Sequence, residues 1–300
     1  MTSYIISGGS GLVGKRLSEI LLEKGNTVSI LGRGNDSSSP IKKYKWDIEK
    51  SEIDKSWLKE TDTIIHLAGA GVAAKKWTAS YKKEIYNSRI QSTKLLYETL
   101  KNNPHTIKTI VASSAIGIYG NDSEKILDES SPTSNTFLAE VCRDWENEVL
   151  KFETLGIRVV ILRTGIVLSK NGGFVSEISK PIKLFVGAAL GTGKQLLSWI
   201  HIDDLCMMYI QSAIDEKKNG IYNAVAPLPE SNETITKKIA ARLHKPILLP
   251  NIPSFIMKLL FGEMAAMILA NQNVSCEKIQ KVGFHFKFND IDSALKDLFQ

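Results

Sequence analysis

The chain has 300 residues, of which 43% are hydrophobic and 23% are charged. This balance supports a large buried core and excludes a disordered chain, a collagen-like chain and a small disulfide scaffold. The net charge of +6 comes from 38 Lys and Arg against 32 Asp and Glu, scattered without the long basic run of a nucleic-acid tail. A mild positive field favours a phosphorylated ligand, although solubility explains the charge equally well.

Three cysteines stand far apart, at Cys142, Cys206 and Cys276, without a Cys-x-x-Cys motif. They predict neither a disulfide framework nor a zinc site, and we expect a reducing compartment. The first apolar stretch is too short for a signal peptide, and no apolar run approaches the ~18 residues of a membrane span. The sequence therefore predicts a cytoplasmic protein with no membrane or nucleic-acid partner.

The first elements in the chain are a strand, a tight turn, a helix and a second strand. Residues 3–7 form an apolar run that ends in glycines, and apolar residues then recur at helical spacing from Leu12 to Leu21. Gly25 closes the helix, and residues 27–31 read as a strand that stops at Gly32. One βαβ unit is thus complete within about 30 residues.

Strands and helices continue to alternate along the middle of the chain. We expect strands at 63–67, 109–112 and 157–162, and helices at 80–100 and 135–155. The last of these strands is apolar throughout, as parallel strands covered on both faces should be. The alternation predicts an α/β fold with a doubly wound parallel sheet. The two helices could form a dimer face, but packing on the sheet explains their apolar stripes equally well, so monomer and homodimer both stay open.

Beyond Arg163 the alternation loosens into glycine-rich connections. A strand is expected at 196–200 and a helix at 203–214, and prolines and two helices, at 235–243 and 255–269, follow. We therefore expect a nucleotide-binding domain over residues 1–165 and a smaller, mostly helical lobe over residues 166–300. Some segments of the second part could return to the first sheet.

Gly8, Gly11 and Gly14 follow a Gly-x-x-Gly-x-x-Gly spacing between the first strand and the first helix. Glycine at the turn lets the backbone approach a pyrophosphate at the helix N-terminus, and Gly14 lets the helix pack closely on the sheet. Because the triplet lies within a βαβ unit, it predicts dinucleotide binding in preference to a bare structural turn.

The end of the second strand bears on the choice between nicotinamide cofactors. An acidic residue there binds the ribose 2′-hydroxyl of NAD, whereas arginine accommodates the 2′-phosphate of NADP. Arg33 occupies this position, and no carboxylate follows before Asp36. Arg33 therefore favours NADP(H) over NAD(H), the alternative being a solvated loop arginine. Asp47 is a weaker candidate for a contact with the adenine.

Longer motifs carry a family resemblance. The runs GGSGLVG (8–14), HLAG (66–69) and SSAIGIYG (113–120) resemble the extended short-chain dehydrogenase/reductase family of the NAD-dependent epimerase/dehydratase type, which has a Rossmann fold. Further segments, at 74–78, 87–90, 163–168 and 198–204, resemble its atypical sugar-nucleotide epimerase branch, which has a characteristic C-terminal domain. The resemblance spans essentially the whole chain and implies an oxidoreductase or epimerase with a small polar or phosphorylated substrate.

The resemblance also implies cofactor contacts at the carboxyl ends of the strands, where ligands of open α/β sheets bind. For the serines of the third motif, strand-end capping is the alternative. The residues implied are Gly8, Ser10, Gly11, Leu12 and Val13 around the pyrophosphate, His66, Ala68 and Gly69 on the adenosine side, Ser113 and Ser114 by the nicotinamide ribose, and Thr164, Gly165 and Ile166 beside the nicotinamide.

The family's chemistry resembles acid-base catalysis by a Ser or Thr, a Tyr and a Lys that lowers the pKa of the phenol. In this sequence the Ser or Thr position falls on Ala115, and the Tyr and Lys positions fall on Leu138 and Cys142. A one-residue slip offers Phe137 and Val141, which are no better. No catalytic residue is therefore assigned, and the standard mechanism is not expected.

Substitute groups for this catalytic set are sparse. Tyr119 is the nearest phenol, and Cys142, Lys76, Arg89 and His201 are polar candidates around the expected pocket. Tyr119 holds a position that is usually structural in the family, and Cys142 is typical of a small core residue. His201 is better explained as a strand-end residue that contacts the second lobe.

Two other features are candidates for a metal site and a substrate cleft. Asp203 and Asp204 could hold a metal, but their place before a helix favours capping of its free N–H groups. Trp199 and Lys194 could line a substrate cleft or belong to an exposed hairpin.

Two functions are consistent with these observations. One is an NADP(H)-dependent oxidoreductase or epimerase, and the other is a non-catalytic NADP(H)-binding regulatory or interaction module. An RNA-binding role gains little support, because no aromatic RNA motif or basic stripe is present.

Overall fold

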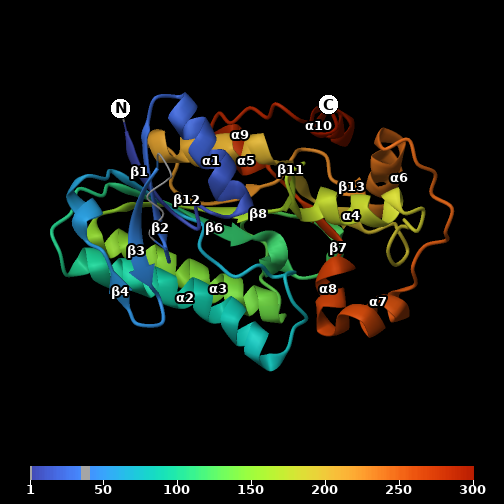
Figure 1. Cartoon of the computed structure of the whole chain (residues 1–300), viewed down its shortest axis with the longest axis horizontal. Coiled ribbons are helices and arrows are strands. Elements are labelled where there is room, and N and C mark those ends of the chain that lie inside the picture. Colours follow the sequence, from blue (N-terminus) through green and yellow to red (C-terminus); the bar gives the residue numbers. More distant parts are fainter. Residues whose placement is uncertain (1, 35–40) are drawn as a thin grey trace.

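The computed structural model describes residues 2–34 and 41–300, with the backbone alone for 122–124. Its centre is an eight-stranded sheet in which every pairing is parallel except that of β3 with β4 (Figure 1). The strand order reverses at β1, so the carboxyl ends of β1 and β5 flank the crevice where ligands of such sheets bind. In order across the sheet, the strands are β12 (Gly220–Ala224), β8 (Arg158–Thr164), β6 (Thr109–Ala115), β5 (Thr63–His66), β1 (Ser3–Ser7), β2 (Thr27–Gly32), β3 (Lys42–Asp47) and β4 (Glu52–Ile53).

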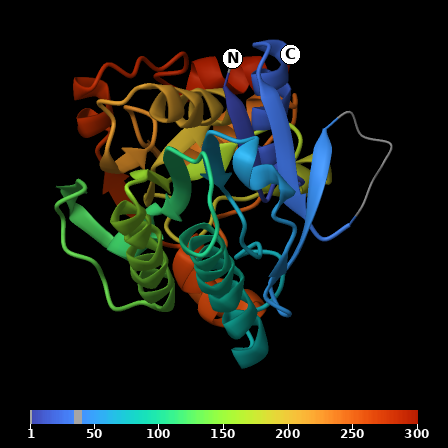
Figure 2. The same cartoon turned by 90° about the vertical axis from the view of Figure 1, so that its left-hand side faces the viewer.

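Helices cover both faces of this sheet (Figure 2). One face carries α1 (Leu12–Glu23) and α5 (Ile202–Ile214), which contact each other, and the other carries α2 (Ala79–Lys101) and α3 (Phe137–Leu150). Two apolar cores therefore lie on opposite sides of the same strands. The predicted doubly wound parallel sheet is confirmed.

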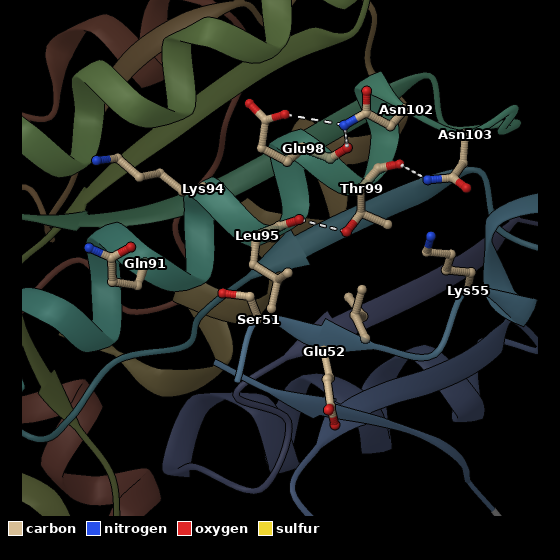
Figure 3. Close-up of a pocket in the computed structure, with 11 residues that line it drawn as sticks. Ser51, Glu52, Lys55, Gln91, Lys94, Leu95, Glu98, Thr99, Asn102 and Asn103 are labelled. Carbon is tan, nitrogen blue, oxygen red and sulfur yellow. Dashed lines mark hydrogen bonds between the residues drawn. The ribbon is translucent and has the colours of Figure 1, made fainter. Parts of the chain in front are cut away.

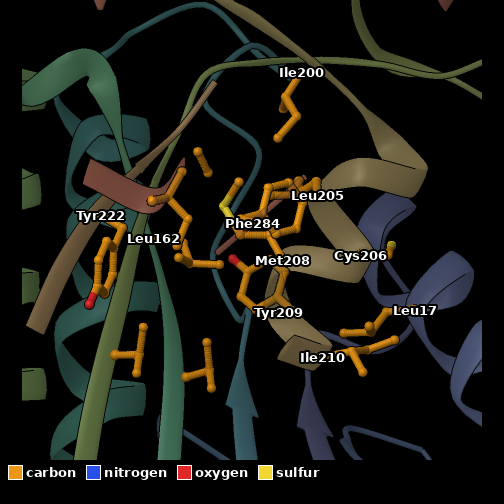
Figure 4. Close-up of a cluster of buried hydrophobic side chains, with 14 of the residues drawn as sticks. Leu17, Leu162, Ile200, Leu205, Cys206, Met208, Tyr209, Ile210, Tyr222 and Phe284 are labelled. Atoms are coloured by element: carbon orange, nitrogen blue, oxygen red, sulfur yellow. The ribbon is translucent and has the colours of Figure 1, made fainter. Parts of the chain in front are cut away.

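The core on the α1 and α5 face shows why the central strands are apolar throughout (Figure 4). Leu17 of α1, Leu162 of β8 and Met208 of α5 have no exposed surface, and Tyr209 is 1% exposed. Each such side chain stabilises the fold by about 1.5–3 kcal/mol relative to leaving it in water. Alternate residues of β8 face the other core, so neither side of the strand tolerates a polar run.

The second half of the chain both returns to the sheet and builds a smaller lobe. Through β12 and α5 it adds a strand and a covering helix to the central layer. The smaller lobe has its own apolar core around the fully buried Trp199. Its elements are β9 (Ile166–Leu168), α4 (Gly173–Lys183), β10 (Leu196–Leu197), β11 (Trp199–His201), β13 (Glu230–Ser231), α6 (Asn232–Arg242) and α10 (Ile291–Leu298).

Three predicted elements are each divided in the structure. The strand expected at 196–200 is two strands, because Ser198 between them turns its side chain to the backbone of Gln272 and Val274. The helix expected at 135–155 begins after the Thr136 cap and ends in a 3₁₀ segment, η3 (Lys151–Leu155).

The helix expected at 255–269 is also broken. Its first part is α7 (Ser254–Phe261), and a 3₁₀ turn, η4 (Gly262–Met264), connects α7 to α8 (Ala265–Ile268). The interruption is at Gly262, whose φ of 58° is a left-handed value that an α-helix does not allow.

Several short elements had no clear periodicity in the sequence. Two of them, β7 (Asp122–Leu127) and β14 (Gln272–Val274), pair with each other in parallel. Gln272 reinforces this pairing by donating to the carbonyls of Ile116 and Gly120 at 2.9 and 2.6 Å. No described helix has the length and apolar character that crossing a membrane requires. The remaining elements are η1 (Ser56–Lys59), η2 (Ile116–Tyr119) and α9 (Glu277–Lys281).

Candidate cofactor site

The glycine turn connects β1 to α1 at the point where the strand order reverses. Gly8 has a φ of +73°, and its carbonyl accepts a hydrogen bond from the N–H of Gly11 at 3.0 Å. A Cβ at Gly14 would lie 2.5 Å from the Gly8 carbonyl oxygen, so only glycine lets the helix sit this close to the turn. The turn thus has the tight backbone and the close helix–sheet packing that the sequence predicted.

The N-terminus of α1 is open to a ligand. Its cap residue is Gly11, which has no side chain to accept from the helix, and the first turn holds no acidic residue. In the described part of the chain, nothing outside the helix accepts from the N–H groups of Leu12, Val13 and Gly14. Ser10 and Gly11 are exposed. Free N–H donors and the positive end of the helix dipole suit a diphosphate, so the residues present fit a dinucleotide.

Arg33 lies directly after β2, next to the end of β1, and is exposed. Asp47 ends β3, and its Oδ1 accepts from the backbone N–H groups of Glu49 and Lys50, both at 3.1 Å. Asp47 therefore organises its own turn. Asp36, the first carboxylate beyond Arg33, lies outside the described residues.

His66 is buried below the edge of the sheet. Its Nδ1 is 2.6 Å from the Ser7 hydroxyl and its Nε2 is 2.9 Å from the Thr93 hydroxyl, which ties β1, β5 and α2 together. Burial, with the nearby Arg89 charge, lowers the pKa of His66 to about 3, so the ring is neutral. The structure thus places the imidazole inside the protein, while Gly69, three residues on, is exposed. Ala68 between them is buried.

Three residues of α2 hold the loop that follows β5. The Ser88 hydroxyl accepts from the N–H of Ala70 at 2.9 Å, and Arg89 donates to the carbonyl of Ala70 at 3.0 Å. The Tyr81 hydroxyl donates to the carbonyl of Gly71 at 2.5 Å. The sequence signal for this clamp was present in the motif at 87–90, but nothing in its spacing revealed which loop it would hold.

The two serines at the end of β6 turn to opposite faces of the sheet. Ser114 is buried, and its hydroxyl donates to Glu146 of α3 at 2.6 Å. Ser113 is half-buried and lies near the Tyr209 phenol, whose pKa burial raises to about 12 against the effect of the Ser113 and Thr164 hydroxyls. The contact predicted between these serines and a nicotinamide ribose stays a prediction.

The end of β8 supplies a half-buried edge. Thr164, Gly165 and Ile166 are all partly exposed there. A Cβ at Gly165 would lie 2.5 Å from the Ser198 carbonyl oxygen, so the absence of a side chain lets β11 approach. The predicted contact of these residues with the nicotinamide also stays a prediction.

The expected catalytic positions are apolar in the structure as in the sequence. Ala115 and Leu138 carry no titratable group, and Cys142 is 5% exposed. Burial, with the nearby Glu146 charge, raises the pKa of the Cys142 thiol to about 11, so it is not a thiolate at neutral pH. In the alternative register, Phe137 packs edge-on against Trp77 and Val141 is buried.

Tyr119 belongs to an internal hydrogen-bond network. Its hydroxyl donates to Asn223 at 2.7 Å and accepts from Arg163 at 2.9 Å. Arg163 also forms a buried pair with Glu146, with N–O distances of 2.9 and 2.8 Å. Burial raises the pKa of Tyr119 to about 12, and Arg163 only partly opposes this shift. Tyr119 is therefore a structural phenol, and the sequence did not reveal the Glu146–Arg163 pair that holds it.

The other substitute candidates are also accounted for. His201 is buried, accepts from the N–H of Asp203 to cap α5, and packs on Phe288 of the smaller lobe at 3.9 Å between ring centroids. Lys76 is exposed. Contact with the second lobe is the role that the sequence favoured for His201.

Asp203 and Asp204 bind protein groups. Asp203 pairs with Arg16 of α1 at 2.7 Å, and Asp204 accepts from the N–H groups of Lys287 and Phe288 at 2.9 and 3.0 Å. Both lie in the first turn of α5, but His201 caps this helix, so the structure does not give the two aspartates the capping role that the sequence favoured. Within residues 2–34 and 41–300, no group of three or more His, Cys, Asp or Glu side chains is arranged to hold a metal.

The structure places Trp199 neither in a substrate cleft nor on an exposed hairpin, the two positions that the sequence left open. The indole is fully buried in the core of the smaller lobe, among residues of α4, α6 and α10, because β11 turns it inward. It therefore cannot line a substrate cleft. Lys194 is exposed on the preceding turn.

A groove of about 490 Å³ lies elsewhere, between β4 and the last turns of α2 (Figure 3). It holds charges of both signs, including Lys55, Lys94 and Glu98, and none of the predicted cofactor residues lines it. Because α2 runs antiparallel to the strands, its last turns lie at the opposite edge of the sheet from the glycine turn. The groove is thus separate from the candidate cofactor site.

The fold and the glycine turn define a nucleotide-binding α/β protein of the epimerase and short-chain dehydrogenase/reductase type. The model of the NAD dependent epimerase/dehydratase family matches residues 4–224, and a domain of unknown function (DUF1731) matches residues 252–298. The chain belongs to the NAD-dependent epimerase/dehydratase family. The resemblance seen in the sequence motifs is confirmed.

Individual proteins match along the whole chain. An epimerase family protein of Staphylococcus saprophyticus is 36% identical over 301 residues, with 99% of each chain covered. The structure of the human epimerase family protein SDR39U1 (isoform 2), solved with NADPH, has a TM-score of 0.88 at 26% identity, with 99% of each chain covered. A nucleoside-diphosphate sugar epimerase of Corynebacterium glutamicum has a TM-score of 0.79 at 31% identity, and the match covers 99% of this chain but 58% of that one.

Proposed function

We propose that the protein binds NADP(H) across the carboxyl edge of the sheet, with the diphosphate at the N-terminus of α1 and the 2′-phosphate at Arg33. The observation that carries this proposal is the uncapped first turn of α1, since its N–H donors have no protein partner in the described chain. The exposed Arg33 beside it can present a planar fork to a phosphate. The NADPH in the structure of the human relative supports NADP(H) over NAD(H).

A bound NADPH supplies a hydride, and the protein's own residues would bind and orient it. Thr164, Gly165 and Ile166 form the half-buried edge beside which the nicotinamide would lie. Because Ala115, Leu138 and Cys142 offer neither a phenol nor an ammonium, a water-mediated or substrate-assisted proton transfer would take the place of the family's standard step. We propose an oxidoreductase or epimerase acting on a small polar or phosphorylated substrate. The relative from Corynebacterium glutamicum, a nucleoside-diphosphate sugar epimerase by name, supports a nucleotide sugar.

A second candidate function is a non-catalytic NADP(H)-binding module. The same three apolar positions favour it, because the cofactor would then act by stabilising one conformation of the protein. Two assays separate the candidates. Loss of the absorbance of protein-bound NADPH after addition of carbonyl compounds detects a reductase, and chromatography of nucleotide sugars incubated with the protein and NADP+ detects an epimerase, which leaves the cofactor unchanged overall. Oxidation of NADPH or a new epimeric sugar supports the enzyme, and neither result across the set supports the module.

Compartment and assembly follow the same reasoning. Cys142, Cys206 and Cys276 are all free and buried, which supports a reducing, cytoplasmic location. The dimer face predicted on α2 and α3 stays a prediction, since their apolar residues are largely buried against the sheet and against each other.

The cofactor proposal is tested by calorimetric titration with NADPH and NADH. We expect one-site binding with NADPH the tighter ligand, and Arg33→Ala should weaken NADPH about tenfold, or about 1.4 kcal/mol, while changing NADH little. Lys24→Ala removes an exposed charge at the far end of α1 and should change neither affinity. Absence of binding by either cofactor, or equal losses for both in Arg33→Ala, would contradict the proposal.

A further inference from the structure

Arg89 of α2 reaches the loop that carries the predicted adenosine contacts. Its Nη1 donates to the carbonyls of Ala70 and Ile85, both at 3.0 Å. The guanidinium lies so close to Gly69 that a Cβ there would be 2.9 Å from its Cζ. Arg89 therefore sits against an exposed glycine at the carboxyl end of β5, on the edge where ligands of this fold bind.

Most of the guanidinium has no protein partner. Nε and Nη2 of Arg89 donate to no described residue, and no described carboxylate pairs with it. Its other close neighbour is the ring of Trp145, 5.2 Å from Cζ. In Arg163, by contrast, both Nε and Nη2 donate to the carboxylate of Glu146. Neither nitrogen belongs to the fully buried unpartnered atoms of the described chain, so the free N–H groups of the half-buried Arg89 can be reached by the oxygen atoms of a ligand.

Arg89 lies close to Cys142 of α3, the position at which the family motif has a lysine and this chain has no cation. Trp145 lies three residues after Cys142, on the same face of that helix, so Arg89 lies beside both. The proximity is also electrostatic, since the Arg89 charge opposes the rise that burial causes in the pKa of Cys142. Cys142 is the residue that falls on the lysine position of the family motif. A positive charge therefore reaches this position from α2 instead of α3.

We infer that Arg89 binds the nicotinamide ribose of the dinucleotide, donating from its free N–H groups to the ribose hydroxyl oxygens. This inference rests on the proposed binding of NADP(H). Arg89 would hold the nicotinamide half of the cofactor, while the first turn of α1 and Arg33 hold the other half. A guanidinium has a rigid fork of donors, so it can bind two neighbouring hydroxyls at once.

The test compares the whole cofactor with a fragment that lacks the nicotinamide ribose. Calorimetric titrations use NADPH and adenosine 2′,5′-bisphosphate with the wild-type protein, Arg89→Gln and Arg89→Lys. We expect Arg89→Gln to weaken NADPH about tenfold and to leave the fragment within about twofold of wild type. Arg89→Lys keeps the charge but loses the fork, and should weaken NADPH by a smaller factor with the fragment again unchanged.

The control is Lys83→Gln, which removes an exposed charge from the same helix and should change neither affinity. Thermal unfolding followed by circular dichroism shows whether each variant is folded, and Arg89→Lys decides the matter if Arg89→Gln is not. Equal losses for NADPH and the fragment, or no loss for either, would overturn the inference and leave Arg89 as a clamp for the loop. If the wild-type protein binds neither ligand, the proposed function itself fails.

Discussion

The two halves of the sheet's carboxyl edge treat their polar groups in opposite ways. On the side of β1 and β2, the N–H groups of the first turn of α1 have no protein partner in the described chain, and Arg33 is exposed. On the side of β6 and β8, Ser114, Tyr119 and Arg163 are buried and bonded to one another or to Glu146. One half leaves backbone donors without protein partners, and the other bonds Ser114, Tyr119 and Arg163 within the fold.

This difference teaches that a polar residue at a strand end is not yet a functional residue. Ser114 and Tyr119 occupy the same motif, but their hydroxyls stabilise the packing of α3 and β12 on the sheet. The backbone N–H groups of Leu12 and Val13, by contrast, have no protein partner in the described chain. What decides between binding and structure is whether a group's hydrogen-bonding capacity is already satisfied within the protein.

Breaking the buried half should have the largest effect. Glu146→Gln removes the carboxylate that neutralises the buried Arg163, and we expect it to lower the free energy of unfolding by about 3–5 kcal/mol. Urea unfolding followed by fluorescence measures the change. Glu148→Gln is the matched control two residues along α3. It pairs with the half-exposed Lys151, so a loss of only about 0.5 kcal/mol is expected. Equal losses at the two positions would refute the contrast.

The stability of the open half should depend on side-chain volume instead of charge. Gly14→Ala places a methyl group 2.5 Å from the Gly8 carbonyl oxygen and 2.6 Å from the Cα of Gly9. Because both contacts are with backbone, we expect a loss of about 2–3 kcal/mol in unfolding free energy, together with loss of NADPH binding. Gly34→Ala, where a Cβ would meet nothing within 4 Å, should retain full stability. A Gly14→Ala protein with wild-type stability and affinity would show that the close packing has no role.

His66 lies between the two halves and should make stability depend on pH. Its pKa is lowered to about 3 in the folded protein, so below its usual value of 6.5 the unfolded chain binds a proton that the native protein does not. The contribution is therefore complete above pH 6.5 and is lost as the pH falls, with a slope of about 1.4 kcal/mol per pH unit.

Urea unfolding at a series of pH values between about 5 and 6 tests this sign, because most carboxylates are still ionised there. His66→Gln should lower the slope of unfolding free energy against pH by about 1.4 kcal/mol per pH unit relative to wild type. His285→Gln replaces an exposed imidazole and should leave the slope unchanged. A wild-type slope that survives in His66→Gln would assign the pH dependence to other groups.

Much of the fold could be predicted from the sequence because its signals are local. The apolar strands and the glycine turn appear as short patterns, and the structure places them in one parallel sheet. The broken helix at Gly262 and the divided strand at Ser198 could not be read in this way. Each depends on a backbone angle or on a partner far along the chain, such as Gln272.

The candidate site was predictable only where its chemistry comes from the backbone. The spacing of Gly8 and Gly14 predicts their role in the turn. Arg89, in contrast, contacts Gly69 and Trp145, which only the fold brings close to it. Trp199 shows the reverse case, since its place after a glycine-rich loop left a cleft or an exposed hairpin open, and the structure buries it. Side-chain direction at a strand end depends on tertiary packing, which the linear pattern does not contain.

A crystal structure of the protein grown with NADPH would show where the dinucleotide binds. We expect the diphosphate to lie against the N–H groups of the first turn of α1, the 2′-phosphate at Arg33, and the nicotinamide half beside the apolar positions Ala115 and Leu138. A dinucleotide bound elsewhere, or a diphosphate held away from α1, would contradict the account.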